Sequence, residues 1–82
     1  MNDEISFKVS WCPVCRQGWI KIAKEKDSKK LFIYCEECEI EWDSPEYIKN
    51  ENAGYFGKYG KAESPTYEEI VRNDWHRFLL RK

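Results

Sequence analysis

Cys12-Pro13-Val14-Cys15 and Cys35-Glu36-Glu37-Cys38 are two C-x2-C pairs separated by nineteen residues. Each pair can form a tight turn that places two thiolates on one side of the backbone. Two such turns at the ends of a β-hairpin complete a tetrahedron of sulfur ligands, and the spacing matches that of zinc sites. The sequence therefore predicts one structural Zn²⁺, held by Cys12, Cys15, Cys35 and Cys38.

Four segments around the cysteines have the pattern of β-strands. Residues 5–11 and 39–43 alternate apolar and polar side chains, which is typical of half-buried strands. Residues 19–23 and 31–34 are rich in strand-forming residues, and the polar stretch 25–30 between them suits a hairpin loop. We therefore expect antiparallel hairpins that carry the two cysteine turns.

The chain after residue 43 has a different character. Ser44-Pro45 predicts the start of a short helix, and residues 54–60 form a loop rich in glycine and tyrosine. Ser64-Pro65 predicts a second helix start, where Thr66 and Glu69 match a capping box. Apolar residues then recur at helical spacing, which predicts one amphipathic C-terminal helix packed on the sheet: Tyr67, Ile70, Val71, Trp75, Phe78 and Leu79.

The two C-x2-C pairs and the hairpin between them resemble the zinc-ribbon fold group. The resemblance covers residues 9–43 and implies a ribbon with two zinc knuckles, but it says little about function. Zinc ribbons often place glycine directly after the second cysteine of each knuckle. In this sequence Arg16 and Glu39 stand at those positions, and Gly18 follows two residues later.

Two other interpretations of the cysteines stay open. Trp11-Cys12-Pro13-Val14-Cys15 superficially resembles a thioredoxin-type redox motif, but such a motif needs a βαβ frame and a helix beginning at its first cysteine. Four thiolates also suit iron, as in rubredoxins, so the ligands alone do not distinguish iron from zinc. We expect zinc.

Length predicts one domain over residues 1–82. The resemblance implies a ribbon over 9–43, and the patterns that follow predict a short helix, the loop and the C-terminal helix over 44–82, so we expect the α+β class. Eighty-two residues give a marginal apolar core unless a metal or a disulfide stabilises it. No apolar run approaches the roughly 20 residues that span a membrane, and the first residues lack the features of a signal peptide. We expect a cytoplasmic protein without a membrane partner.

Charge is distributed unevenly along the chain. The formal net charge is -1, yet residues 36–51 carry seven acidic residues against Lys49 alone. Such a block is usually a solvated surface, but it can also dock a basic partner. The candidate partner-binding residues lie in this block and in the loop that follows: Glu36, Glu37, Glu39, Glu41, Asp43, Tyr55 and Tyr59.

We expect a protein-binding module without catalytic residues. Four cysteines fill a zinc ion's coordination sphere, and His76, which is the only histidine, has no second histidine to work with. The acidic block and aromatic tail resemble, in general character, the immunity proteins that neutralise basic nuclease toxins. The alternative is a nucleic-acid-binding or transcription- or translation-associated module, because five lysines lie along the central hairpin: Lys21, Lys24, Lys26, Lys29 and Lys30.

Overall fold

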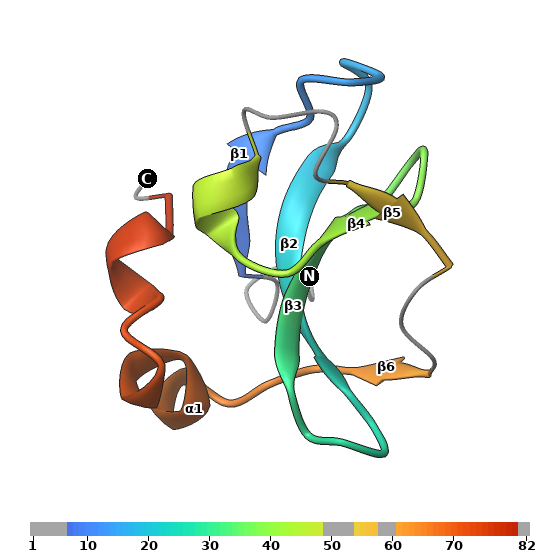
Figure 1. Cartoon of the computed structure of the whole chain (residues 1–82). Helices are drawn as coiled ribbons and strands as arrows, with labels where there is room; N and C mark the ends of the chain where they lie inside the picture. The colour runs from blue at the N-terminus through green and yellow to red at the C-terminus, as the bar shows by residue number, and fades with distance from the viewer. Residues whose placement is uncertain (1–6, 49–53, 58–60, 81–82) are drawn as a thin grey trace, which may run out of the picture.

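The computed structural model describes residues 7–48, 54–57 and 61–80 (Figure 1). An antiparallel sheet of six strands forms its centre, with the order β1-β2-β3-β4-β5 and with β6 also paired to β2. The strands are β1 (Lys8–Trp11), β2 (Trp19–Glu25), β3 (Leu31–Cys35), β4 (Ile40–Trp42), β5 (Tyr55–Phe56) and β6 (Ala62–Glu63). Three helical segments complete the fold, which is of the expected α+β class: η2 (Pro45–Tyr47), α1 (Tyr67–Arg72) and η4 (His76–Phe78).

Each of the four predicted strands is present, with boundaries that differ by up to three residues. The N-terminal part of the first prediction, residues 5 and 6, lies outside the described residues. The structure departs further from the prediction in the glycine- and tyrosine-rich segment. Tyr55 and Phe56, which the sequence predicts to lie in a loop, form β5 and pair with β4. Gly54 precedes this strand, and a Cβ atom there would lie 2.5 Å from Cδ1 of Ile40, so a larger residue would have to displace that side chain.

The core lies on the face of the sheet that carries the isoleucines. Ile22 stands opposite Ile33, which in turn stands opposite Trp42, so three strands bring apolar side chains together. Ile33 and Trp42 are both fully buried. Because side chains alternate along a strand, burying Ile40 and Trp42 turns Glu41 to the other face, as the sequence predicts. Ile70 of α1 joins this core and is fully buried.

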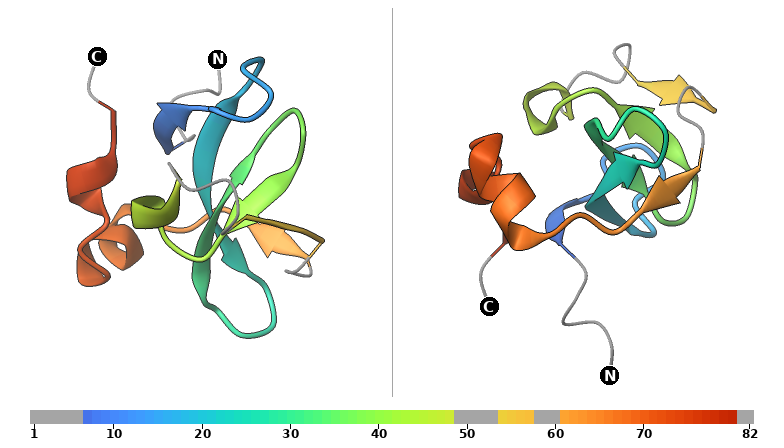
Figure 2. Two further views of the ribbon diagram at one scale, coloured as in Figure 1. Left: turned by 45° about the horizontal axis from the view of Figure 1, so that its top comes forward. Right: turned by 90° about the horizontal axis from the view of Figure 1, so that it is seen from below.

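The two C-terminal helical segments, α1 and η4, pack beside β1 and η2, on the side away from β5 (Figure 2). The capping box that begins α1 is present, because Thr66 accepts from the Glu69 N–H and Glu69 accepts from the Thr66 N–H. At the far end the backbone N–H of Leu80 donates to the carbonyl of Lys8 at 3.0 Å. This bond holds the end of the described chain against the first strand.

The predicted continuous C-terminal helix is wrong, because α1 stops at Arg72. The N–H of Asp74 donates to Val71 O, and that of Trp75 donates to Ile70 O, which together form a Schellman motif. Asp74 has a left-handed φ of 64°, a conformation that aspartate tolerates better than most residues. The break also divides the predicted apolar stripe between two segments. Trp75 and Phe78, after the break, pack on the core, whereas Tyr67 and Val71 of α1 are exposed.

Within the described ranges, no helix is both long enough and apolar enough to cross a bilayer.

Candidate metal centre

The two cysteine turns lie side by side because the strands that carry them are paired. The first knuckle (residues 12–18) connects β1 to β2, and the second knuckle (residues 35–39) connects β3 to β4. Cys35 is the register partner of Ile20, near the start of β2. The first knuckle is closed by a 2.9 Å hydrogen bond from the Cys12 N–H to the carbonyl of Gly18.

The two knuckles share one equivalent backbone hydrogen bond. The N–H of Arg16 donates to Cys12 O at 3.1 Å, and the N–H of Glu39 donates to Cys35 O, also at 3.1 Å. Arg16 and Glu39 adopt left-handed φ angles of 57° and 66°. The backbone conformation that usually selects glycine is therefore present in both knuckles, although neither residue is glycine.

Backbone N–H groups also point at the sulfur of the first cysteine in each knuckle. The Cys15 N–H donates to Cys12 Sγ at 3.5 Å, and the Cys38 N–H donates to Cys35 Sγ at 3.4 Å. A third bond runs from the Glu37 N–H to Cys35 Sγ at 3.3 Å. Such bonds stabilise a negatively charged sulfur, which is the form that binds metal.

The four sulfur atoms lie within 4.8 Å of one another, and all four cysteines are free thiols. Cys12 Sγ lies 3.9 Å from Cys38 Sγ, and Cys15 Sγ lies 3.5 Å from Cys35 Sγ. A tetrahedron with metal–sulfur bonds of about 2.3 Å has sulfur–sulfur edges of about 3.8 Å. The predicted cluster of four cysteines is confirmed, and its dimensions fit a single tetrahedral metal ion.

Without a cation, the cluster does not keep all four thiols ionised. The backbone N–H of Gln17 lowers the pKa of Cys15 to about 7. Burial raises the pKa of Cys38 to about 12, and burial also raises the pKa of Cys35. A divalent cation would remove this penalty by neutralising the thiolates, so metal binding must release protons.

Gly18 is a structural residue of the site that the zinc-site spacing alone does not identify. A Cβ atom at this position would lie 2.5 Å from Cγ and 2.9 Å from Cβ of Glu37. The backbone of the first knuckle therefore packs directly on a side chain of the second. The signal in the sequence is the glycine itself, placed just before β2.

The structure brings three of the predicted acidic residues together on the outer face of the sheet. Glu36, Glu39 and Glu41 line a groove of about 220 Å³ whose other walls include Phe32, Tyr34 and the metal-ligand candidate Cys35. The Lys21 ammonium lies 2.8 Å from the Glu36 carboxylate, and the Trp19 N–H donates to that carboxylate at 3.1 Å. The pKa of Glu36 is lowered, and the hydrogen bond from Lys21 is the main cause.

The other candidate partner-binding residues are more dispersed. Glu37 is exposed beside Gly18, and Asp43 is half-buried after β4. Tyr55, which is 42% exposed, stands opposite Glu41 in the register of β4 and β5. Tyr59 lies outside the described residues. His76 is exposed and approaches Asp74 at 4.0 Å.

The hairpin lysines of the nucleic-acid alternative are largely used in ion pairs. Lys24 contacts Glu69 at 2.7 Å and Glu63 at 3.5 Å, which links β2 to β6 and α1. The hydrogen bond to Glu69 raises the pKa of Lys24. Lys29 lies 3.7 Å from Glu63. Together with the Lys21 pair, these contacts offset much of the positive charge on the hairpin.

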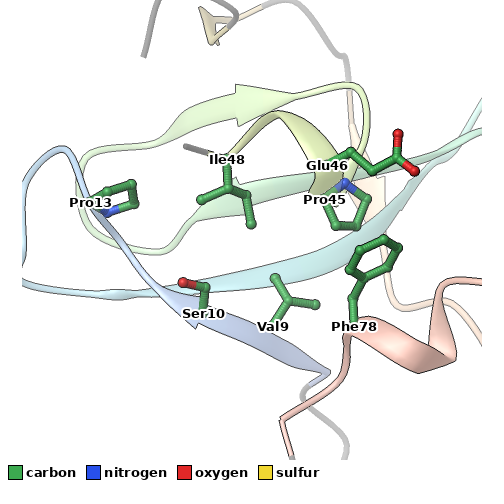
Figure 3. Close-up of a pocket in the computed structure, with 7 residues that line it drawn as sticks. All are labelled: Val9, Ser10, Pro13, Pro45, Glu46, Ile48 and Phe78. Carbon is green, nitrogen blue, oxygen red and sulfur yellow. The ribbon is translucent and has the colours of Figure 1, made fainter. Parts of the chain in front are cut away.

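A larger hollow of about 580 Å³ opens on the other face, between β1, η2 and η4 (Figure 3). Its lining is mainly apolar, with Ser10 and Glu46 as the polar members: Val9, Ser10, Pro13, Pro45, Glu46, Ile48 and Phe78. Pro13 belongs to the first knuckle, but the cysteines do not line the hollow.

The chain matches no protein-family model, no curated protein and no solved structure.

Proposed function

We propose that the chain is a non-enzymatic protein-interaction module whose zinc-ribbon fold is held by one structural Zn²⁺. The sulfur spacing and the matching hydrogen bonds of the two knuckles support a closed four-thiolate site. Such a site leaves no position open for a reactive water, so the metal contributes stability rather than catalysis. We propose zinc rather than iron because C-x2-C pairs at this spacing in cytosolic proteins are typical of zinc sites.

The observation that carries the interaction role is the acidic groove beside the metal centre. Glu36, Glu39 and Glu41 line it, and the Lys21 ammonium pairs with the Glu36 carboxylate. Cys35 also lines it, so the formal charge of -2 on a zinc tetrathiolate would add to the same field. Tyr34 in the groove and Tyr55 beyond Glu41 supply aromatic surface of the kind that anchors protein interfaces.

A partner that suits this surface is a basic protein. Complementary charge accelerates association and excludes acidic competitors. Among basic partners, we propose a nuclease toxin as the class to test first, in which case the chain would act as its immunity protein. Glu37 and Asp43 would extend the acidic surface beyond the groove, and Tyr59 is proposed from its sequence position alone.

Nucleic-acid binding is the second candidate, and one observation favours it. Trp11 is 46% exposed and packs edge-on against Trp19, with ring centroids 4.9 Å apart. The Lys8 ammonium lies 5.0 Å from the Trp19 ring. Aromatic and basic groups together can bind single strands, but the neighbouring acidic groove would repel phosphates. We therefore rank this function second.

A binding experiment with two probes separates these functions. A fluorescent deca-arginine peptide represents a basic partner, and a fluorescent 20-nucleotide single-stranded RNA represents nucleic acid. The zinc-loaded chain should bind the peptide at low salt and lose affinity as salt rises, while binding RNA at least tenfold more weakly. Preferential RNA binding would reverse the ranking, and binding of neither probe would remove the docking role.

A charge-matched pair of variants tests the surface itself. Glu39→Lys with Glu41→Lys should lower peptide affinity at least tenfold. The control, Asp27→Lys with Glu68→Lys, makes the same charge change at two exposed residues outside the groove. If both double variants weaken binding equally, only net charge matters and the groove is not the docking surface.

A further inference from the structure

The four sulfurs of the metal centre differ in their access to solvent. Cys12 and Cys35 are fully buried, whereas Cys15 and Cys38 are half-buried. Each knuckle therefore presents its second cysteine to solvent and hides its first. An oxidant that enters from solvent would reach Cys15 or Cys38 before the two buried sulfurs.

Each half-buried sulfur lies close to the buried sulfur of the opposite knuckle. Cys15 Sγ lies 3.5 Å from Cys35 Sγ, and Cys38 Sγ lies 3.9 Å from Cys12 Sγ. In both pairs, the half-buried cysteine can be oxidised by peroxide and the buried cysteine can resolve the product. The buried sulfurs also accept hydrogen bonds from backbone N–H groups within their own knuckles.

We propose that the metal centre is a peroxide-sensitive switch in which oxidation joins the two knuckles through Cys15–Cys35 and Cys12–Cys38 disulfides. The proposal rests on the zinc centre of the proposed function but not on any partner. In the oxidised form, each disulfide joins one cysteine of each knuckle, and no disulfide forms within a C-x2-C turn.

The reaction balances with hydrogen peroxide as the oxidant. The Cys15 thiolate attacks one peroxide oxygen, the O–O bond breaks, and a proton converts the leaving hydroxide to water, which leaves a sulfenic acid on Cys15. The Cys35 thiolate then attacks that sulfur, and the hydroxide that leaves takes a second proton. Two thiolates lose two electrons and one peroxide gains them. Cys15 and Cys35 would then no longer be available as zinc ligands. Cys38 and Cys12 repeat the sequence with a second peroxide.

The connectivity decides what happens to the fold. Disulfides between the knuckles keep the β1–β2 and β3–β4 turns together after zinc has gone. Disulfides within each knuckle would close only short loops and leave the two turns free to separate. The proposed switch therefore exchanges a metal-held sheet for a covalently held one.

Tryptic peptide mapping without reduction reads this connectivity directly. Residues 9–16 and 31–49 are the tryptic peptides that contain the cysteines, with both cysteines of one knuckle in each. Zinc-loaded protein should release about one zinc per chain with peroxide, and the two peptides should become linked. Fragmentation of the linked pair, both between Cys12 and Cys15 and between Cys35 and Cys38, should show that Cys15 is linked to Cys35.

Other results would overturn the proposal. Separate peptides, each 2 Da lighter, would show oxidation within the knuckles, and a Cys15–Cys38 link would show a different cross-knuckle pairing. Retention of zinc at a peroxide dose that oxidises the guanidinium-unfolded chain would show that the centre is protected. Zinc content measured before peroxide is added tests the metal centre separately, so the two failures are distinguishable.

Discussion

Arg16 and Glu39 occupy equivalent positions in the two knuckles, each directly after the second cysteine, and both have left-handed backbone angles. Their N–H groups make equivalent bonds to Cys12 O and Cys35 O. A left-handed conformation costs a non-glycine residue about 1–2 kcal/mol. The hydrogen bonds and the placement of the sulfurs must outweigh this cost at both positions.

Replacing either residue with glycine should stabilise the zinc-loaded protein. The free energy gained by relieving backbone strain exceeds the free-energy cost of the glycine's greater freedom in the unfolded chain. Arg16→Gly and Glu39→Gly should therefore each raise the free energy of unfolding by about 0.5–1 kcal/mol. Chemical denaturation measures the effect. The control is alanine at the same positions, which removes the side chain but keeps the strain. Equal stabilisation by alanine would place the effect in the side chains.

Gly18→Ala should have the opposite effect. The new methyl group would meet Cβ and Cγ of Glu37, so the knuckles would have to move apart. Overpacking of this kind costs about 1–3 kcal/mol, and here it should also weaken zinc affinity. Competition with a calibrated chelator measures that affinity. Gly57→Ala is not a matched control because Gly57 has a positive φ. Ser64→Ala, at an exposed residue outside the site, is suitable. Unchanged affinity in the Gly18 variant would show that the contact is easily relieved.

The ion pair between Lys24 and Glu69 predicts a pH dependence. Because the folded pKa of Lys24 is raised above 10.5, its contribution to stability is complete below that pH and is lost as pH rises through the raised value. Glu69→Gln removes the charge but keeps an acceptor for the Thr66 N–H. The variant should be less stable than the parent protein near neutral pH, and the difference should shrink at alkaline pH. A pH-independent difference would mean that charge does not cause it.

The central hairpin and the metal cluster could be predicted from sequence because both depend on local spacing. A C-x2-C turn fixes which side its sulfurs take, and alternation fixes which face Ile40 and Trp42 occupy. The left-handed angles at Arg16 and Glu39 could not be predicted from residue type, since neither residue favours them.

The C-terminal region shows where periodicity is insufficient. Ile70 and Trp75 lie on one apolar stripe, but the Schellman motif between them ends α1 and redirects the chain. Asn73-Asp74 is the sequence signal for this break, since asparagine and aspartate tolerate the left-handed conformation. Likewise, the pairing of Lys24 with Glu63 and Glu69 depends on tertiary contacts that a charge count cannot reveal.

Removing the metal should unfold the sheet. The core is small and lies directly behind the knuckles, so much of its folding free energy should come from ligation. Chelation should shift tryptophan fluorescence to longer wavelength, because fully buried Trp42 would meet water. Adding zinc under reducing conditions should restore the original spectrum. A spectrum unchanged by complete metal removal would show that the apolar core suffices.

X-ray absorption at the zinc edge, on protein purified under reducing conditions with its metal content quantified, tests the metal centre most directly. We predict one zinc per chain with four sulfur neighbours at about 2.3 Å. A first shell containing nitrogen or oxygen, or well under half an equivalent of zinc after reconstitution, would contradict the account that Cys12, Cys15, Cys35 and Cys38 form a closed structural site.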